Sequence, residues 1–182
     1  MIQPWTKTGS KPLGDYRIFT VRSDEKISPR TGLTHDFFII DCVDWVNVVA
    51  VTPARELVMV EQYRHGSNTV ELEIPGGITD TTDASPVHTA VRELREETGY
   101  AGENARPLAS VFANPAIMSN TCHTVLVEDC TLQHPVQWDS GEDMLTRLVP
   151  IPEIPGLVST AMIRHPLVIV ALYHFDLFSR GR

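Results

Sequence analysis

Apolar residues in the first half of the chain form short runs separated by turn signals, which is the pattern of β-strands. The clearest run covers residues 45–52, which are rich in valine and predict a buried strand. Residues 69–74 alternate instead, so that Val70, Leu72 and Ile74 lie on one side of a predicted strand. Strands are predicted at residues 16–22, 36–41, 45–52, 57–64, 69–74, 105–113, 122–128 and 144–149.

The first 42 residues form a segment of their own in this pattern. Residues 1–14 are polar and contain two prolines, which is typical of an extended arm. A Ser-Pro-Arg-Thr-Gly turn at residues 28–32 separates the first two predicted strands, which can therefore pair as a hairpin. Because a two-stranded hairpin is marginally stable alone, we predict that residues 1–43 are a dimerisation arm and that the protein is a homodimer.

Helical spacing replaces the strand pattern after residue 84. Ser85 can cap the helix, Pro86 suits its first turn and Gly99 suits the position just past its end. A second helical stretch is predicted after Pro155, with Pro166 in a first turn. The apolar face that we expect to turn toward the core in the first helix consists of Val87, Ala90, Val91 and Leu94.

The mixture of strands and helices with short turns predicts an α/β (α+β) protein. The chain has 182 residues, of which 42% are hydrophobic and 21% charged, values that suffice for a sizeable core. We therefore predict one main domain at residues 44–182, preceded by the arm.

Charge and targeting signals narrow the classes of partner. The net charge of −8 argues against nucleic acid and anionic membranes as partners. The N-terminal residues lack the apolar region of a signal peptide, and no apolar run is long enough to span a membrane. Three cysteines without metal-type spacing favour reduced thiols, and together these features predict a cytoplasmic protein.

The first predicted helix carries an acidic cluster. Glu93, Glu96 and Glu97 stand at i, i+3 and i+4, a spacing that places three carboxylates on one face. Their repulsion is offset in part by Arg92, which pairs with Glu96 at i, i+4. A solvated charged face is one interpretation. The other is a set of hard oxygen ligands for Mg²⁺, for which substrate phosphates complete the shell.

A glycine turn and a family signature favour the second interpretation. Gly76 and Gly77 precede the helix, and backbone without side chains can approach a ligand closely. The sequence Arg-Glu-Leu-Arg-Glu-Glu-Thr-Gly-Tyr at residues 92–100 resembles the second half of the Nudix box, the signature of the Nudix hydrolases. It matches the family pattern at every specified position.

The first half of the box departs from that pattern. Asp83 stands where the family has glutamate, and eight residues instead of seven separate it from Arg92. We interpret this as an insertion of one residue at 84–85, in the turn before the helix. The insertion leaves the glutamate spacing intact but is expected to move Asp83 off the family's position, so that Asp83→Asn has a milder effect than changes at the glutamates.

The wider resemblance is to the ADP-ribose pyrophosphatase branch of the family. Residues 44–50, 61–66 and 73–77 carry it, with Pro115 about fifteen residues beyond the box. The resemblance implies a Nudix-type α/β/α sandwich with a mixed sheet and an N-terminal antiparallel strand arm that helps relatives dimerise. It also implies that Gly76, through its carbonyl, binds metal together with the three glutamates.

The remaining site residues follow from the same resemblance and from residue chemistry. Glu96 is a metal ligand or orients water, and Arg92 holds the glutamates. A loop at residues 137–143 offers the base, for which Glu142 is favoured and Asp139 and Asp143 are alternatives. Candidate substrate contacts are Arg64, whose fork suits phosphate, Trp45, which suits a nucleobase, and Gly77.

The function implied is Mg²⁺-dependent hydrolysis, with Mn²⁺ as the alternative ion, of a nucleoside diphosphate linked to another moiety. ADP-ribose or a nucleotide sugar is the expected small-molecule nucleotide substrate, and two phosphomonoesters are the products. One alternative is a catalytically silent Nudix domain that binds a nucleotide as a regulator. Another is a Nudix enzyme acting on a dinucleoside polyphosphate or a coenzyme A derivative, because the box fixes chemistry and not substrate.

Overall fold

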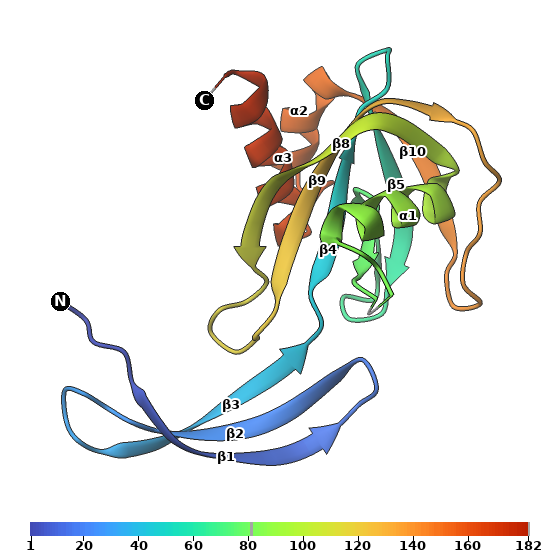
Figure 1. The fold of residues 1–182 in the computed structure, drawn as a ribbon. Helices are drawn as coiled ribbons and strands as arrows, with labels where there is room; N and C mark the ends of the chain where they lie inside the picture. The colour runs from blue at the N-terminus through green and yellow to red at the C-terminus, as the bar shows by residue number, and fades with distance from the viewer. Residues whose placement is uncertain (81, 182) are drawn as a thin grey trace. The chain divides into compact units, whose positions relative to one another are not determined.

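The computed structural model describes residues 1–80 and 82–181, which form two compact units (Figure 1). The N-terminal unit comprises residues 1–44 together with residues 112–121. The core unit comprises residues 45–111 and 122–181. The functional division predicted from the sequence, with residues 1–43 as a dimerisation arm, stays a prediction.

The N-terminal unit is an antiparallel sheet in the order β1-β2-β3, built from Thr6–Asp15, Phe19–Ile27 and Thr34–Cys42. The extended arm predicted for residues 1–14 is thus largely a strand that pairs with β2. The sequence of β1 shows no alternation of apolar residues, because ion pairs and hydrogen bonds of polar side chains join this strand to the sheet. Lys7 and Ser10 both reach the buried carboxylate of Asp24, at 2.8 and 2.7 Å.

The loop at residues 112–121 completes the N-terminal unit through backbone contacts with β3. The N–H of Ile40 donates to the carbonyl of Ile117 at 2.8 Å, and the N–H of Ser119 donates to the carbonyl of Ile40 at 3.1 Å. These contacts extend the parallel bridge between Ile40 and Met118. A segment far along the chain therefore belongs to the unit that the first 44 residues begin.

The core unit contains two sheets. In the first, β4 runs parallel to β9 and antiparallel to β7, so the sheet is mixed. In the second, β5 pairs antiparallel with β10 on one side and with β6 on the other. The strands are β4 (Trp45–Ala50), β5 (Glu56–Arg64), β6 (Thr69–Glu73), β7 (Gly76–Ile78), β8 (Tyr100–Phe112), β9 (Thr121–Leu132) and β10 (Met144–Pro150).

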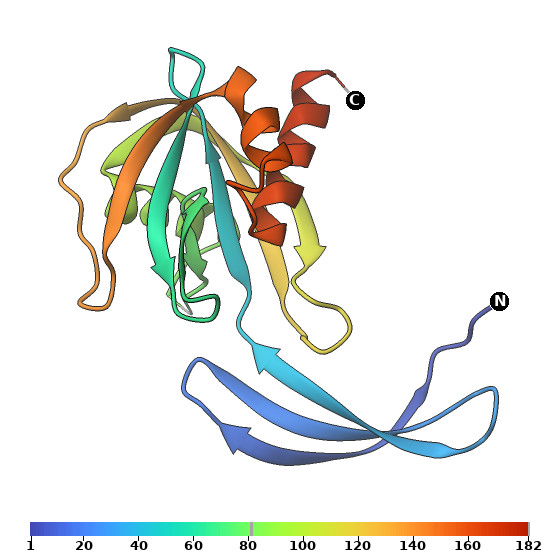
Figure 2. The ribbon, with the colours of Figure 1, turned by 180° about the vertical axis from the view of Figure 1, so that it is seen from behind.

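Helices cover both faces of β4, as Figures 1 and 2 show. On one face Val48 packs in a cluster with Leu94 of α1 (Pro86–Thr98). On the other face Val49 packs in a cluster with Phe175 of α3 (Pro166–Ser179). Both faces are buried, which explains why β4 reads as a continuous apolar run. The predicted α/β/α sandwich is confirmed, and the remaining helices are η1 (Ile151–Glu153) and α2 (Ile154–Ser159).

None of the helices in residues 1–80 and 82–181 combines the length and the apolarity that crossing a membrane requires.

Candidate functional site

Helix α1 begins and ends where the sequence predicts. The Ser85 hydroxyl accepts a hydrogen bond from the N–H of His88 at 3.2 Å, and Pro86 occupies the first turn. Gly99 adopts a left-handed conformation with φ 74°, which a residue without a side chain enters at little cost. The predicted apolar face is correct for three of its four members. Val91 is the exception, since it is 39% exposed.

The C-terminal half of α1 places Glu97 in the interior of the core unit. Its residue exposure is 3%, and one of its oxygens accepts a hydrogen bond from the N–H of Gly76 at 3.1 Å. Burial raises the pKa of Glu97 to about 8, and the negative charges of Glu93 and Glu142 add to the rise while the Gly76 N–H opposes it. Within the described ranges, Glu97 forms no ion pair with a basic side chain.

The two glycines of β7 allow the helix and the strand to lie close together. A Cβ atom at Gly77 would stand 2.5 Å from Oε1 of Glu93, and one at Gly76 would stand 2.4 Å from the carbonyl oxygen of Val46. A side chain at Gly76 would collide with the backbone of β4, and one at Gly77 would displace the Glu93 carboxylate. The glycine pair therefore brings bare backbone against the carboxylate of Glu93, whose pKa is raised by burial.

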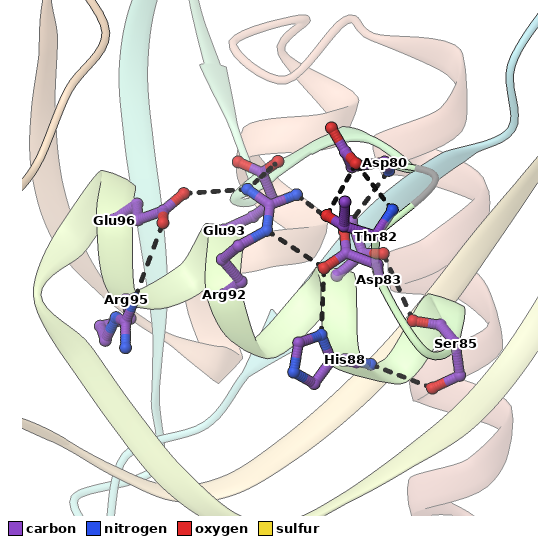
Figure 3. Close-up of polar contacts among 10 residues, drawn as sticks. Asp80, Thr82, Asp83, Ser85, His88, Arg92, Glu93, Arg95 and Glu96 are labelled. Atoms are coloured by element: carbon purple, nitrogen blue, oxygen red, sulfur yellow. Dashed lines mark hydrogen bonds and ion pairs between the residues drawn. The ribbon is translucent and has the colours of Figure 1, made fainter.

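Arg92 links the acidic residues of this region, as Figure 3 shows. Its Nη1 lies 3.0 Å from Glu93 and 2.9 Å from Glu96, and its Nη2 lies 3.0 Å from Asp83. The hydrogen bond from Arg92 holds the pKa of Asp83 well below its usual range, and His88 at 3.0 Å adds to the effect. Arg92 thus fixes the side-chain positions of two glutamates of the cluster and is itself fixed by Asp83.

This contact changes the expectation for Asp83. The inserted residue does not move Asp83 away from the helix, because the turn before Ser85 absorbs it. The Asp83 carboxylate is 5% exposed and receives both Nε and Nη2 of Arg92, at 3.4 and 3.0 Å. Sequence spacing alone could not show that an aspartate one residue out of step would still reach the arginine.

We therefore expect Asp83→Asn to be damaging. The amide keeps one acceptor but loses the charge that orients Arg92, so the free energy of unfolding should fall by about 1–3 kcal/mol. Turnover should fall by roughly 10- to 100-fold, the usual cost of losing a residue that orients a ligand side chain. Thermal unfolding and steady-state kinetics measure the two effects.

Asp80→Asn is the matched control for that variant. Asp80 lies in the same turn and is exposed, and among the described residues its carboxylate accepts hydrogen bonds from the N–H and the hydroxyl of Thr82. We expect the control to match the wild type in both measurements. Equal behaviour of the two variants would contradict the role of Asp83 in orienting Arg92.

The three glutamates differ in their surroundings. Glu96 is bound by Arg92 at 2.9 Å and approached by Arg95 at 3.6 Å. Glu93 also contacts Arg92, at 3.0 Å, but it faces the glycine turn, as Glu97 does. Among residues 1–80 and 82–181, no group of three or more His, Cys, Asp or Glu side chains has the arrangement of a metal site. Glu93 and Glu97 are the glutamates for which a close approach to the glycines of β7 is seen, Glu93 at Gly77 and Glu97 at the N–H of Gly76.

Glu142 lies on an exposed turn in the segment that connects β9 to β10. Its carboxylate accepts a hydrogen bond from the N–H of Asp139 at 2.9 Å, and its own N–H donates to the Asp139 carbonyl at 3.0 Å. The negative charge of Glu142 contributes to the raised pKa values of both Glu93 and Glu97. The fold therefore brings this turn within electrostatic range of α1, across more than forty residues of sequence.

The predicted substrate contacts Arg64 and Trp45 occupy different settings. Arg64 forms a fork with the buried carboxylate of Glu73, with distances of 2.7 and 2.9 Å. This ion pair raises the pKa of Arg64, to which the negative charges of Glu97 and Glu142 also contribute. Trp45 is half-buried at the start of β4.

Sequence analysis did not anticipate the carboxylates of β6. Val70, expected on an apolar face, is 62% exposed, while Glu71 and Glu73 are buried. Glu71 is held by Arg164 at 2.6 Å, and the hydrogen bond from Thr69, followed by that from Arg164, lowers the pKa of Glu71. Glu71 thus pairs with Arg164, which is distant in sequence, and Glu73 pairs with Arg64 on the neighbouring strand β5. The alternation of apolar and polar residues along β6 does not predict such ion pairs.

Comparison with known proteins agrees with this geometry. The NUDIX domain family matches residues 44–168. An ADP-ribose pyrophosphatase of Bacillus subtilis is 32% identical over 87 residues, which are 48% of this chain and 46% of that protein. A methanol dehydrogenase activator of Bacillus methanolicus is 40% identical over 107 residues, 59% of this chain and 57% of that protein. The chain thus spans about half the length of the curated relatives it matches.

A solved structure extends the comparison to the fold. The crystal structure of an ADP compounds hydrolase superimposes with a TM-score of 0.87, covering 100% of this chain and 97% of that chain. The sequence identity is 20%, so this likeness concerns the fold. The family match, the α/β/α sandwich and the glutamates of α1 beside a glycine turn together show that the chain belongs to the Nudix family.

Proposed function

We propose that the protein is a metal-dependent pyrophosphatase that hydrolyses a nucleoside diphosphate linked to another moiety, with ADP-ribose or a nucleotide sugar as the substrate. The observation that carries this proposal is the buried carboxylate of Glu97 beside Glu93, whose pKa values are both raised by burial. Glu93 shares the charge of Arg92 at 3.0 Å, whereas Glu97 pairs with no basic side chain among the described residues, so the two carboxylates together favour binding of a cation. The pyrophosphatase name of the Bacillus subtilis relative adds support for the substrate class.

The donor set fits a hard divalent cation such as Mg²⁺, with Mn²⁺ as the alternative. Glu93 and Glu97 supply carboxylate oxygens and Gly76 supplies a backbone carbonyl, and one or two carboxylates plus substrate phosphates are what Mg²⁺ usually takes. Glu96 would join the shell or orient water if Arg92 released it. When bound, the cation neutralises phosphate charge and makes a bound water more acidic.

The residues of the chain have separate tasks in this proposal. Arg92, oriented by Asp83, keeps Glu93 in place through the 3.0 Å contact. Glu142 accepts a proton from the attacking water, whose oxygen forms a bond to one phosphorus while the bridging P–O bond breaks. Two phosphomonoesters leave, and Glu142 returns its proton to solvent. Arg64 is a candidate phosphate contact if its fork exchanges Glu73 for substrate.

The test is a panel of ADP-ribose, nucleotide sugars, a dinucleoside polyphosphate and a coenzyme A derivative, assayed with Mg²⁺ or Mn²⁺ for phosphomonoester products. We expect hydrolysis of ADP-ribose or a nucleotide sugar that EDTA abolishes. Hydrolysis of another member would reassign the substrate. Binding of a nucleotide without any cleavage would replace the proposal with the regulatory alternative.

We also propose that the protein is a cytoplasmic homodimer and that the N-terminal unit provides its contact. Support comes from large apolar side chains that this unit exposes, including Ile18 at 71%, Phe38 at 63% and Leu33 at 61%. Solution scattering at micromolar concentration should give the mass of a dimer, and Phe38→Glu should shift it toward the monomer. A wild-type monomer at that concentration would contradict the proposal.

A further inference from the structure

The segment of residues 133–143, between β9 and β10, is fastened to the C-terminal end of α1. The N–H of Gln137 donates to the carbonyl of Glu96 at 2.8 Å, and the indole Nε1–H of Trp138 donates to the carbonyl of Glu97 at 2.9 Å. The last carbonyls of a helix have no partner within the helix, so an outside donor satisfies them. Both carbonyls belong to glutamates of the acidic cluster.

Trp138 is the last of these anchors before Glu142. Further back, the N–H groups of Gln133 and His134 both donate to the carbonyl of Gly99 at 3.0 Å. After Trp138, the described residues of the segment form hydrogen bonds within the turn from Asp139 to Glu142, before the chain enters β10. The indole is thus the nearest link between the Glu142 turn and α1.

The other end of the turn is fixed by the sheet. Met144 is buried and pairs with Gln62 at the start of β10. Glu142 therefore lies on a short stretch between two fixed residues. One is Trp138, whose indole is hydrogen-bonded to α1, and the other is Met144 of β10, which pairs with β5. Each residue of such a stretch spans at most about 3.5 Å, so fixing both ends restricts the positions that the Glu142 carboxylate can occupy. Releasing one end removes part of this restriction.

We propose that Trp138 is a positioning residue for Glu142. Its indole N–H, held by the Glu97 carbonyl, ties the position of the Glu142 carboxylate to the backbone of the helix that carries Glu93 and Glu97. The inference rests on the proposed hydrolysis and goes beyond it, because nothing in the family signature includes a residue at this position. Trp138 is 40% exposed as a residue, which assigns its effect to the hydrogen bond more than to filling the core.

Trp138→Phe tests this inference, since it keeps an aromatic ring and removes the donor. We expect kcat to fall by roughly 10- to 100-fold with little change in KM, because misplacing a catalytic group by about 1 Å has costs of this size. In a Glu142→Gln background the same substitution should change kcat by less than about 2-fold, since residues that act through one another are not additive. Full additivity of the two substitutions would overturn the inference.

A second measurement does not depend on activity. Hydrogen exchange of the metal-free protein, read by mass spectrometry, should show faster exchange at residues 139–143 in Trp138→Phe than in the wild type. Unchanged exchange would overturn the anchoring. Gln133→Ala is the control in the same segment, because its side chain bonds to the Ala101 carbonyl and to Thr131 and not to α1.

The two proposals fail in distinguishable ways. If the wild type hydrolyses nothing in the panel, the proposed function fails and the catalytic part of this inference fails with it, while hydrogen exchange still decides the anchoring. If the wild type is active and Trp138→Phe and Gln133→Ala both match it in kcat, only the inference about Trp138 is overturned.

Discussion

Glu97→Gln is expected to abolish most turnover and, at the same time, to stabilise the metal-free protein at alkaline pH. The amide is nearly the same size and its carbonyl can still accept the hydrogen bond from Gly76. It lacks the charge that a hard cation requires, so Mg²⁺ binding measured by calorimetry should be lost. The same missing charge removes a burial cost from the folded state.

The stability effect follows from the pKa of Glu97, which burial raises from an ordinary 4.5 to about 8. Between these values the folded protein holds a proton that the unfolded chain releases, so stability falls as pH rises through this window. Above about pH 8 the wild type carries the full cost, on the order of a few kcal/mol. Below about pH 4.5 the cost is absent, because the carboxyl is protonated in both states.

Chemical denaturation in EDTA at about pH 6 and about pH 9 measures this difference. The wild type should lose more stability between the two than Glu97→Gln does. Glu103→Gln is the control, since Glu103 is an exposed glutamate of β8 and should leave the wild-type pH dependence unchanged. Identical pH dependence of wild type and Glu97→Gln would show that the buried carboxylate carries no such cost.

Glu142→Gln is expected to lower kcat by roughly 100- to 10,000-fold, the range that a general base contributes. Glu142 is exposed and supports no core, so the variant should unfold at the wild-type temperature. Its KM and Mg²⁺ affinity should stay close to wild type, because Glu93 and Glu97 remain. Steady-state kinetics over a range of substrate and Mg²⁺ concentrations separate these quantities.

Two neighbouring carboxylates serve as controls and as alternatives for that role. Asp139 and Asp143 lie in the same acidic segment, and their amide variants should lower kcat much less than Glu142→Gln. If Glu142→Gln is silent and one of these variants is inactive, the base is the residue that it replaces. If all three are silent, Glu96 becomes the remaining candidate.

The extent and chemistry of the central helix were determined by local sequence. Ser85, Pro86 and Gly99 act on the backbone within a few residues, so their effects could be predicted without knowledge of the fold. The spacing of Glu93, Glu96 and Glu97 follows from helical geometry alone. Strand β4 was equally clear, because a strand buried on both faces carries a continuous apolar run.

Other elements were held by contacts that leave little trace in the local sequence. Strand β1 is polar, and its pairing depends on ion pairs and hydrogen bonds to β2 that no apolar pattern signals. The burial of Glu71 and Glu73 depends on arginines at positions 164 and 64. Apolar alternation therefore misassigned Val70, because the partner of a buried charge is chosen by the fold.

Tertiary structure alone decided which carboxylates meet at α1. The turn before Ser85 absorbs one extra residue and still brings Asp83 to Arg92, a result that counting residues could not give. The segment after β9 returns to the end of α1, where Trp138 meets the carbonyl of Glu97. The local sequence thus determined helix α1 and the spacing of its carboxylate oxygens, through interactions that span one or two helical turns. Only the folded chain determined the pKa of Glu97 and the neighbours of Arg92, because burial and long-range contacts arise when distant segments pack.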